Sequence, residues 1–368
     1  MNKETILAIS LLAGTIIGAG IFALPYFFNL LGFLPALFYL FFFMFFYYFI
    51  HLMYIKVLSL EKEKHQFFYL LHKYFSFKKA NFLSILIFLG LIFVMLVYLV
   101  LAGSFLNSIL KNINLIYLVL FFWLFSSIFI FTKLKFISLA EFLGILSIFL
   151  IILILFFYSF NFKFDIDFFK KNDFKIYLLP LGTFLFSFAG RPALHKLFEF
   201  YKQKENFSLK KVIFFGTFIP LVIYFLFVIS VLKINPNVSP ETLNSLNFLP
   251  NNLIILLIVL GLITLWTSYF MIGVNVKDIL ILDLKISKNL ASFLVLFLPI
   301  FLYFIGFNNF LKVISFVGGV FLGLEGVIII RLWQKAFYKK SRFYYFSYFF
   351  YLFFLIALIY EVIFFFNF

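Results

Sequence analysis

The chain has 368 residues, of which 65% are hydrophobic and only 12% are charged. A soluble domain cannot bury that much apolar surface, and apolar runs of about 20 residues, the length of a membrane-spanning helix, recur along the sequence. The composition therefore predicts an all-α integral membrane protein with many spans. The absence of cysteine excludes disulfides, thiolate metal sites and cysteine nucleophiles.

Hydrophobic length, together with charged or Pro- and Asn-rich breaks, predicts eleven membrane spans. We place them at residues 5–31, 33–57, 80–110, 115–132, 136–160, 176–200, 210–232, 251–282, 289–306, 309–333 and 343–366. The connectors are short, so a single transmembrane domain is expected over residues 1–368. The connector at 233–250 has room for a short lid-like helix.

The net charge of +16 is explained by topology. With the N-terminus in the cytoplasm, 22 of the 30 Lys and Arg residues fall on the inner side, 7 fall on the outer side, and Arg191 lies within a span. This asymmetry is the positive-inside pattern of a multi-pass protein of the cytoplasmic membrane. It places the N-terminus inside and the C-terminus outside, and it leaves no need for a nucleic-acid partner.

The first span contains the stretch GTIIGAGIFALPY at residues 14–26, with three glycines and Pro25. Within a helix, Gly is about 1 kcal/mol and Pro about 3 kcal/mol less favourable than Ala. Unwound backbone at membrane depth persists only where it lines a cavity or faces a ligand, as in the discontinuous helices of secondary transporters. The alternative is a close contact between two helices at small residues.

The sixth span, LLPLGTFLFSFAGRPALHKLFEF at residues 178–200, repeats this feature. Each of the two spans carries Gly-Thr followed by Pro ten or eleven residues later. Interruptions at matching positions of two halves favour a five-plus-five inverted repeat with broken helices 1 and 6. The first repeat would cover about 5–160, the second about 176–333, and an extra helix about 343–366.

The motifs GTIIGAGIFALP and FSFAGRPALHKLFE resemble those of amino acid permeases of the amino acid–polyamine–organocation superfamily, most of all its aromatic amino acid and amino acid/auxin branches. The chain departs from that pattern at Arg191, where His or an uncharged residue is expected. The resemblance implies a leucine-transporter-type fold. It also implies that backbone amides of span one bind the substrate carboxylate, at Ala19, Gly20 and Ile21. Carbonyls freed at the two breaks would bind the substrate ammonium, at Thr15, Ile16, Phe186, Ser187 and Ala189.

Depth alone makes three side chains candidates to face the substrate, although packing is the favoured role for each: Tyr98, Phe188 and Trp266.

Span eight places three hydroxyls on one helix face, at Thr264, Thr267 and Ser268. In the leucine-transporter fold a hydroxyl pair at this depth forms a sodium site with carbonyls of broken span one. The resemblance implies such a site here, formed by the Thr267 and Ser268 hydroxyls and by the carbonyls of Gly14, Ile17 and Thr264. The alternative is that these hydroxyls bond back to carbonyls of their own helix.

Proton coupling is the competing expectation, because carboxylates within a membrane are costly and commonly functional. Glu325 and Glu141 are the candidate proton carriers, whereas Glu361 is expected to be interfacial near the outer end of its span. For Arg191 we rank permanent pairing with Glu325 or Glu141 first, contact with an acidic substrate group second, and a watery vestibule third.

These features predict a secondary active transporter that moves a small amino acid by alternating access, coupled to Na⁺ or H⁺. Two alternatives share the fold: an amino-acid-sensing subunit like those of spore germinant receptors, and an exchanger that needs no ion gradient. The sequence lacks a Walker loop and a Ser/His/Asp arrangement, so enzyme activity is not expected. Neither a cofactor nor a metal site is predicted beyond the possible Na⁺ ion.

Overall fold

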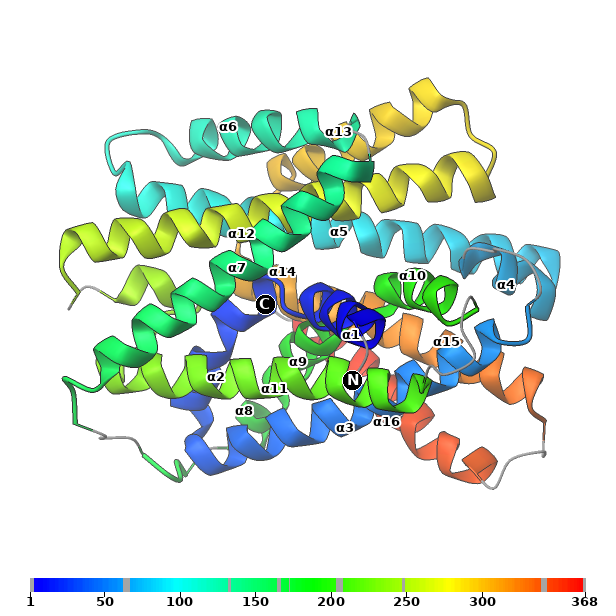
Figure 1. Cartoon of the computed structure of the whole chain (residues 1–368), viewed down its shortest axis with the longest axis horizontal. Helices are drawn as coiled ribbons and strands as arrows, with labels where there is room; N and C mark the ends of the chain where they lie inside the picture. Colours follow the sequence, from blue (N-terminus) through cyan, green and yellow to red (C-terminus); the bar gives the residue numbers. More distant parts are fainter. Residues whose placement is uncertain are drawn as a thin grey trace.

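The computed structural model describes residues 3–61, 67–131, 134–163, 167–171, 173–202, 208–246, 249–338 and 343–366. Within these ranges every regular element is a helix, as the apolar composition predicts (Figure 1). Helices suit lipid because each one satisfies its own backbone hydrogen bonds.

The first half of the chain forms α1 to α7 with two short 3₁₀ turns. Their bounds are α1 Lys3–Ile16, η1 Ala19–Ala23, α2 Leu24–Leu31, α3 Phe33–Leu58, α4 Phe67–Tyr74, α5 Phe77–Ile109, α6 Leu115–Ile128, η2 Phe129–Phe131 and α7 Leu134–Ser159. The second half forms α8 to α16, a 3₁₀ turn η3 and two π-helical segments, η4 and η5. Their bounds are α8 Phe174–Leu178, α9 Pro180–Phe188, α10 Arg191–Lys202, α11 Leu209–Ile234, η3 Thr242–Ser245, α12 Asn251–Asp278, η4 Ile279–Asp283, α13 Lys288–Phe304, α14 Phe310–Phe316, η5 Val317–Leu322, α15 Gly323–Ala336 and α16 Phe343–Phe366.

Each of the eleven predicted spans coincides with a helix or with helices in series. Six helical segments are long and apolar enough to cross a membrane, and α1 with η1 and α2 forms a seventh that is bent by 48°. Three shorter apolar helices lie at Leu115–Phe131, Leu143–Ser159 and Lys288–Phe304. A multi-pass membrane protein is therefore confirmed, whereas the count of eleven crossings stays a prediction.

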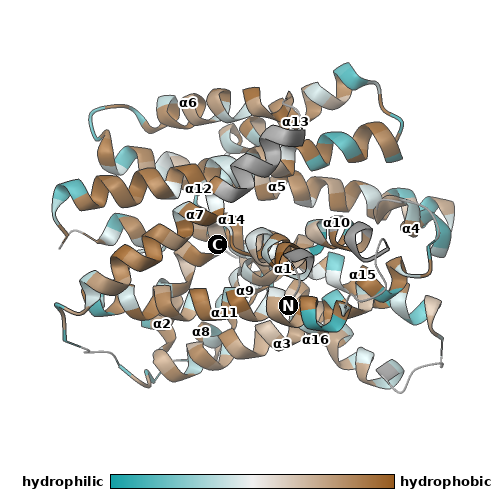
Figure 2. Cartoon of the chain, viewed as in Figure 1, coloured by the Kyte–Doolittle hydropathy of each residue, from teal (hydrophilic) through white to brown (hydrophobic). Residues whose placement is uncertain are grey.

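The outer surface is apolar, as expected for a protein that is solvated by lipid. On α16, for example, Leu352, Ile356, Ile359 and Ile363 form one helix face and are 54–58% exposed. Figure 2 shows hydrophilic residues at the helix ends and connectors, with hydrophobic residues along the helix middles. The long axis of the molecule therefore follows the direction in which it crosses the membrane.

The two interrupted helices lie in the interior of the bundle. The half-helices α1 and α10 pack against each other, η1 packs against α9, and α11 covers α1 and α2 (Figure 1). On one side α12 packs against α5 and α7, and on the other α15 packs against α3 and α16. This arrangement brings both breaks to the middle of the molecule.

Candidate functional site

The first break separates α1 from η1 at Ile17 and Gly18. The amides of Ala19 and Gly20 belong to the first turn of η1, where a helix offers its own N–H groups no internal acceptor. Pro25 lies in the first turn of α2, where its missing N–H costs nothing. The Gly and Pro residues thus place a helix end in the buried interior of the protein.

The second break lies between α9 and α10. Ala189 is extended, with φ −68° and ψ 122°, and Arg191 and Pro192 begin α10. The carbonyls at the end of α9 consequently lack the amide donors that the next turn of a continuous helix would provide. Both predicted interruptions, in spans one and six, are present in the structure.

The two breaks are in direct contact. A Cβ atom added to Gly20 would lie 2.8 Å from Ser187 Cα, and one added to Gly190 would lie 2.7 Å from Ile16 Cγ1. At Gly20, backbone therefore approaches backbone where the substrate carboxylate and ammonium sites were predicted, and a side chain there would force the half-helices apart. At Gly190 the close neighbours are the side chains of Ile16 and Leu12.

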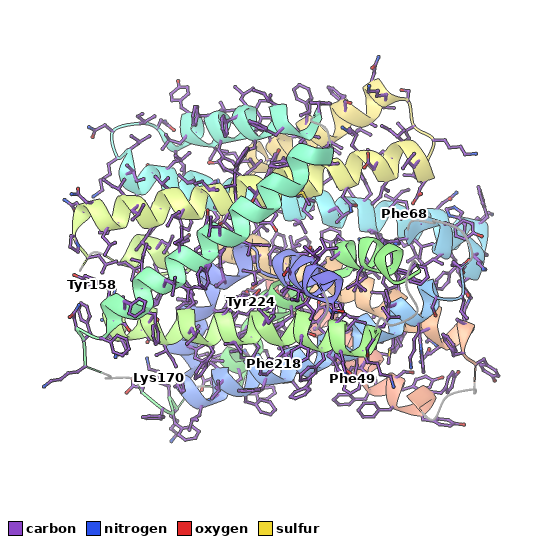
Figure 3. All side chains as sticks on the ribbon, in the orientation of Figure 1. Phe49, Phe68, Tyr158, Lys170, Phe218 and Tyr224 are labelled. Carbon is purple, nitrogen blue, oxygen red and sulfur yellow. The ribbon has the colours of Figure 1, made fainter. Side chains whose placement is uncertain are left out.

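Tyr224 of α11 bridges the two breaks. Its hydroxyl lies 2.9 Å from the Ile16 carbonyl oxygen and 2.7 Å from the Ser187 carbonyl oxygen, and the side chain is fully buried. Figure 3 labels Tyr224 near the centre of the molecule. A phenol has one hydrogen to donate, so the two carbonyls must share it. Sequence reasoning missed this residue, although both of its acceptors were among the predicted ammonium ligands.

Two of the three predicted cavity side chains also lie at the breaks. A Cβ atom added to Gly18 would lie 3.0 Å from the Tyr98 hydroxyl, and the Phe188 ring meets the Tyr224 ring edge-on at 5.4 Å. Trp266 instead packs against Phe129 of η2, with ring centroids 4.9 Å apart. The alternative of a packing role therefore fits Trp266 best.

The hydroxyls predicted to bind sodium have other partners in this structure. Thr264 donates to the Leu260 carbonyl, and Thr267 donates to the Thr264 carbonyl at 2.9 Å. The Ser268 side chain is hydrogen-bonded to Tyr98. The two threonine contacts match the alternative of bonding back to the same helix, whereas Ser268 contacts α5.

The span-one carbonyls predicted for that ion lie beside α7. A Cβ atom added to Gly14 would overlap Ile145 of α7, and one added to Gly144 of the same helix would overlap the Thr267 hydroxyl. Gly14 of α1 and Thr267 of α12 thus lie against adjacent residues of α7, Ile145 and Gly144. Ile17 is buried at the break, where its amide donates to the Ala13 carbonyl.

Arg191 is ion-paired with Glu325 of α15. The Arg191 Nε atom lies 2.8 Å from Glu325 Oε2, and the two side chains are only 4% and 10% exposed. Pairing with one of the two span carboxylates, the first of the three interpretations, is what the structure shows. Glu141 lies in α7, but its side chain falls outside the described residues.

The connector helix α4 covers this ion pair. The Arg191 guanidinium lies 4.5 Å above the ring of Phe67, the first residue of α4. Nearby, the Tyr54 hydroxyl and His195 Nε2 are hydrogen-bonded at 3.0 Å, which ties α3 to α10. These contacts lie toward the end of the molecule where Figure 3 labels Phe68.

A salt bridge holds α4 in place. Lys73 Nζ lies 2.8 Å from both carboxylate oxygens of Glu61, which is buried. The Glu61 carboxylate raises the pKa of Lys73 because it stabilises the charged ammonium.

The opposite side of the breaks is covered by the connector between α11 and α12. Within the described residues its one regular element is the 3₁₀ turn η3, in the connector that had room for a short lid-like helix. The Thr242 hydroxyl donates to the Phe22 carbonyl of η1. The Asn244 amide donates to the Ser104 hydroxyl of α5 at 2.7 Å, so the connector is fastened over the first break.

The sequence suggested that Glu361 is interfacial. In the structure its side chain is buried within the protein and only 1% exposed. One of its carboxylate oxygens accepts a hydrogen bond from the Gly182 amide of α9 at 3.1 Å. The reason is that α16 turns this residue toward the bundle, on the face opposite its lipid-facing residues.

The comparisons with known proteins agree with this geometry. The family model for tryptophan/tyrosine permeases matches residues 1–365. The chain belongs to the tryptophan/tyrosine permease family. The permease is thus a secondary amino acid transporter of the membrane and not an enzyme, as the sequence predicted. None of the curated proteins compared with it matches in sequence.

Among solved structures, the permease is similar to MhsT, which was crystallised in complex with L-phenylalanine. The TM-score is 0.62 at 15% sequence identity, and the match covers 99% of this chain and 97% of MhsT. At this identity the likeness shows the fold, which is of the leucine-transporter type and was predicted from the resemblance.

Proposed function

We propose that this permease carries an aromatic amino acid across the cytoplasmic membrane by alternating access and binds it at the two helix breaks. The observation that supports this most is the contact between the breaks, with one Tyr224 hydroxyl shared by the Ile16 and Ser187 carbonyls. The family description and the phenylalanine bound by the similar MhsT favour an aromatic side chain.

Each charged group of the amino acid has a complementary partner at the breaks. The ammonium brings three donors to carbonyls that now share one hydrogen, and it would replace the Tyr224 hydroxyl there. The further ammonium ligands would be carbonyls of Thr15, Phe186 and Ala189. The carboxylate would bind the amides of residues 19–21, at the start of η1, where the helix dipole favours an anion. Arg191 would remain paired with Glu325, and the charged groups of the substrate would bind backbone amides and carbonyls.

Alternating access requires that the two sides of the site open in turn. The Arg191–Glu325 pair under α4 would form the gate on the cytoplasmic side, and the connector around η3 would cover the outer side. This assignment uses the charge asymmetry of the sequence, with the N-terminus inside and the C-terminus outside. The coupling ion would be Na⁺, at Gly14, Ile17, Thr264, Thr267 and Ser268, or H⁺, with exchange as the gradient-independent alternative.

The test of this function is ligand-induced thermal stabilisation of the purified protein with each of the twenty amino acids, with and without sodium. A ligand that binds only the folded state raises the melting temperature. We expect the largest shifts with Trp, Tyr and Phe. Shifts with small or charged amino acids alone would refute the aromatic assignment, and dependence on sodium would favour the span-eight site over protons.

Replacing Tyr224 by phenylalanine is expected to lower the melting temperature of the substrate-free protein. The change leaves the buried carbonyls of Ile16 and Ser187 without their donor, at a cost of about 1–3 kcal/mol. Because a substrate ammonium supplies new donors, saturating tryptophan should stabilise this variant more than it stabilises the wild type.

The matched control is Tyr303→Phe in α13, a buried tyrosine whose hydroxyl is not hydrogen-bonded within the described residues. It should leave both melting temperatures unchanged. Equal substrate-induced shifts in Tyr224→Phe and the wild type would show that the ammonium does not bind at these carbonyls.

A further inference from the structure

Glu361 lies on the buried stripe of α16. The residues at this spacing of three and four are all at most 3% exposed: Ser347, Phe350, Phe354, Ala357 and Glu361. Four of them fill space against neighbouring helices, as expected of a packed stripe. The fifth brings a carboxyl group into the interior of the membrane domain.

Three glycines make room for this carboxyl group. A Cβ atom on Gly319 of η5 would overlap Glu361 Cγ, and one on Gly318 would overlap the Gly182 carbonyl of α9. A Cβ atom on Gly182 would overlap both the Ser315 carbonyl oxygen and the Glu361 carboxylate, so no side chain fits there either. The π-helical segment η5 widens the helix at this point, and such segments are frequent at functional sites.

The groups around the carboxyl are neutral. From α9 come the Gly182 amide, which donates to it, and the Thr183 hydroxyl, which is hydrogen-bonded to Ser315 of α14 at 3.1 Å. On α16 itself the neighbour is Tyr360, whose hydroxyl donates to the Lys175 carbonyl of α8 at 3.4 Å.

Other titratable groups on these elements do not neutralise Glu361. The hydroxyl of Tyr39 in α3 donates to the Tyr177 carbonyl of α8 and not to Glu361. The side chain of Lys175 is exposed, and η5 contributes only glycines and apolar residues. Lys312 is the basic residue of α14, one turn before Ser315, and it is not ion-paired with Glu361. Among the described residues, no cation pairs with this carboxyl.

We propose that Glu361 is the proton-binding site of this permease, and that its protonation is coupled to substrate binding through α9. The nine-residue half-helix α9 carries the Gly182 amide near its start and the predicted ammonium ligands at its end. At 1.5 Å per residue, Gly182 and Ser187 lie about 8 Å apart along the same helix. The carboxylate is stabilised by the amide at the helix start, whereas a neutral acid is tolerated by its apolar surroundings.

The proton would enter from the end of the molecule that carries α8. The Tyr360 hydroxyl already joins α16 to that end, and the Ser315 carbonyl offers an acceptor for the acid proton within the niche. Glu325, by contrast, is already ion-paired with Arg191. The inference rests on the proposed transport function and assigns its coupling ion.

The test uses proteoliposomes without sodium and radiolabelled L-tryptophan. The wild type should accumulate tryptophan when the outside is acidic and should exchange internal for external tryptophan without a gradient. In Glu361→Gln the amide oxygen still accepts the Gly182 hydrogen bond, but the proton site is gone. This variant should lose accumulation entirely and keep exchange at a rate close to that of the wild type.

The control is Asp173→Asn, the equivalent change at an exposed carboxylate just before α8, and it should accumulate tryptophan like the wild type. Accumulation by Glu361→Gln under the same pH gradient would overturn the proton assignment. Absence of exchange in the wild type would instead refute the transport function itself.

If Glu361→Gln does not fold, a measurement on the wild type tests the proton assignment instead. Tryptophan binding to the purified protein in weakly buffered solution should take up protons, because coupling between the two sites is reciprocal. Binding without proton uptake at every pH at which the protein is folded would overturn the inference.

Discussion

Replacing Gly20 by alanine is expected to reduce aromatic amino acid uptake by about ten- to a hundredfold. The new Cβ atom would lie 2.8 Å from Ser187 Cα, which belongs to the backbone of the other break and cannot turn aside as a side chain would. Overpacking of this kind costs about 1–3 kcal/mol, and each 1.4 kcal/mol corresponds to a factor of ten in affinity. Uptake into proteoliposomes, measured at equal protein content, gives the comparison.

The control for this change is Gly323→Ala in α15. A Cβ atom at Gly323 would meet its nearest neighbour, the Phe354 carbonyl oxygen, at 3.7 Å, which is an ordinary van der Waals contact. This variant should transport at the wild-type rate. Near-normal uptake by Gly20→Ala would mean that the breaks do not need to approach each other for transport.

Removing one partner of the Arg191–Glu325 ion pair is expected to destabilise the protein more than any other single change described above. Arg191→Met leaves the Glu325 carboxylate buried without its cation, and Glu325→Leu leaves the guanidinium in the same position. Breaking a buried pair costs about 3–5 kcal/mol, whereas replacing both partners by apolar residues is often neutral. The double variant should therefore regain most of the melting temperature that either single variant loses.

Asp167→Asn serves as the control for this experiment. It breaks the pair with Lys170, whose two side chains are 70% and 34% exposed, and exposed pairs contribute about 0–1 kcal/mol. Its melting temperature should stay close to that of the wild type. Single variants of Arg191 and Glu325 as stable as Asp167→Asn would show that the buried pair does not stabilise this end of the molecule.

The breaks were predictable from sequence because Gly and Pro are so unfavourable within a helix that few arrangements tolerate them at membrane depth. The positions of Gly18, Gly20 and Gly190 therefore located both interruptions. The partner of Arg191 could be narrowed to two carboxylates, because a guanidinium inside a membrane needs an anion. The choice between Glu325 and Glu141 depended on helix packing, which the sequence does not encode locally.

Tyr224 could not be predicted, because nothing in its local sequence distinguishes it from the other 20 tyrosines. Its acceptor Ile16 is 208 residues away, and the contact exists only because α11 packs across α1. In a chain that is apolar on every face, periodicity does not reveal which side of a helix faces the bundle.

Glu361 was misplaced for a related reason. Its position near the end of a span suggested an interfacial residue, yet depth along a helix does not fix the direction of a side chain. A signal was present: Ser347, Ala357 and Glu361 share one face of an otherwise apolar helix, and small or polar residues in membranes gather where helices meet. The glycine pair at 318–319 marks the facing surface.

The most direct test of the account is an experimental structure of the permease with L-tryptophan bound. We expect the substrate carboxylate within hydrogen-bond distance of the amides at residues 19–21 and the ammonium at the Ile16 and Ser187 carbonyls. The Tyr224 hydroxyl should then no longer bridge those carbonyls. Tryptophan bound away from both breaks, with the Tyr224 bridge intact, would contradict the proposed site.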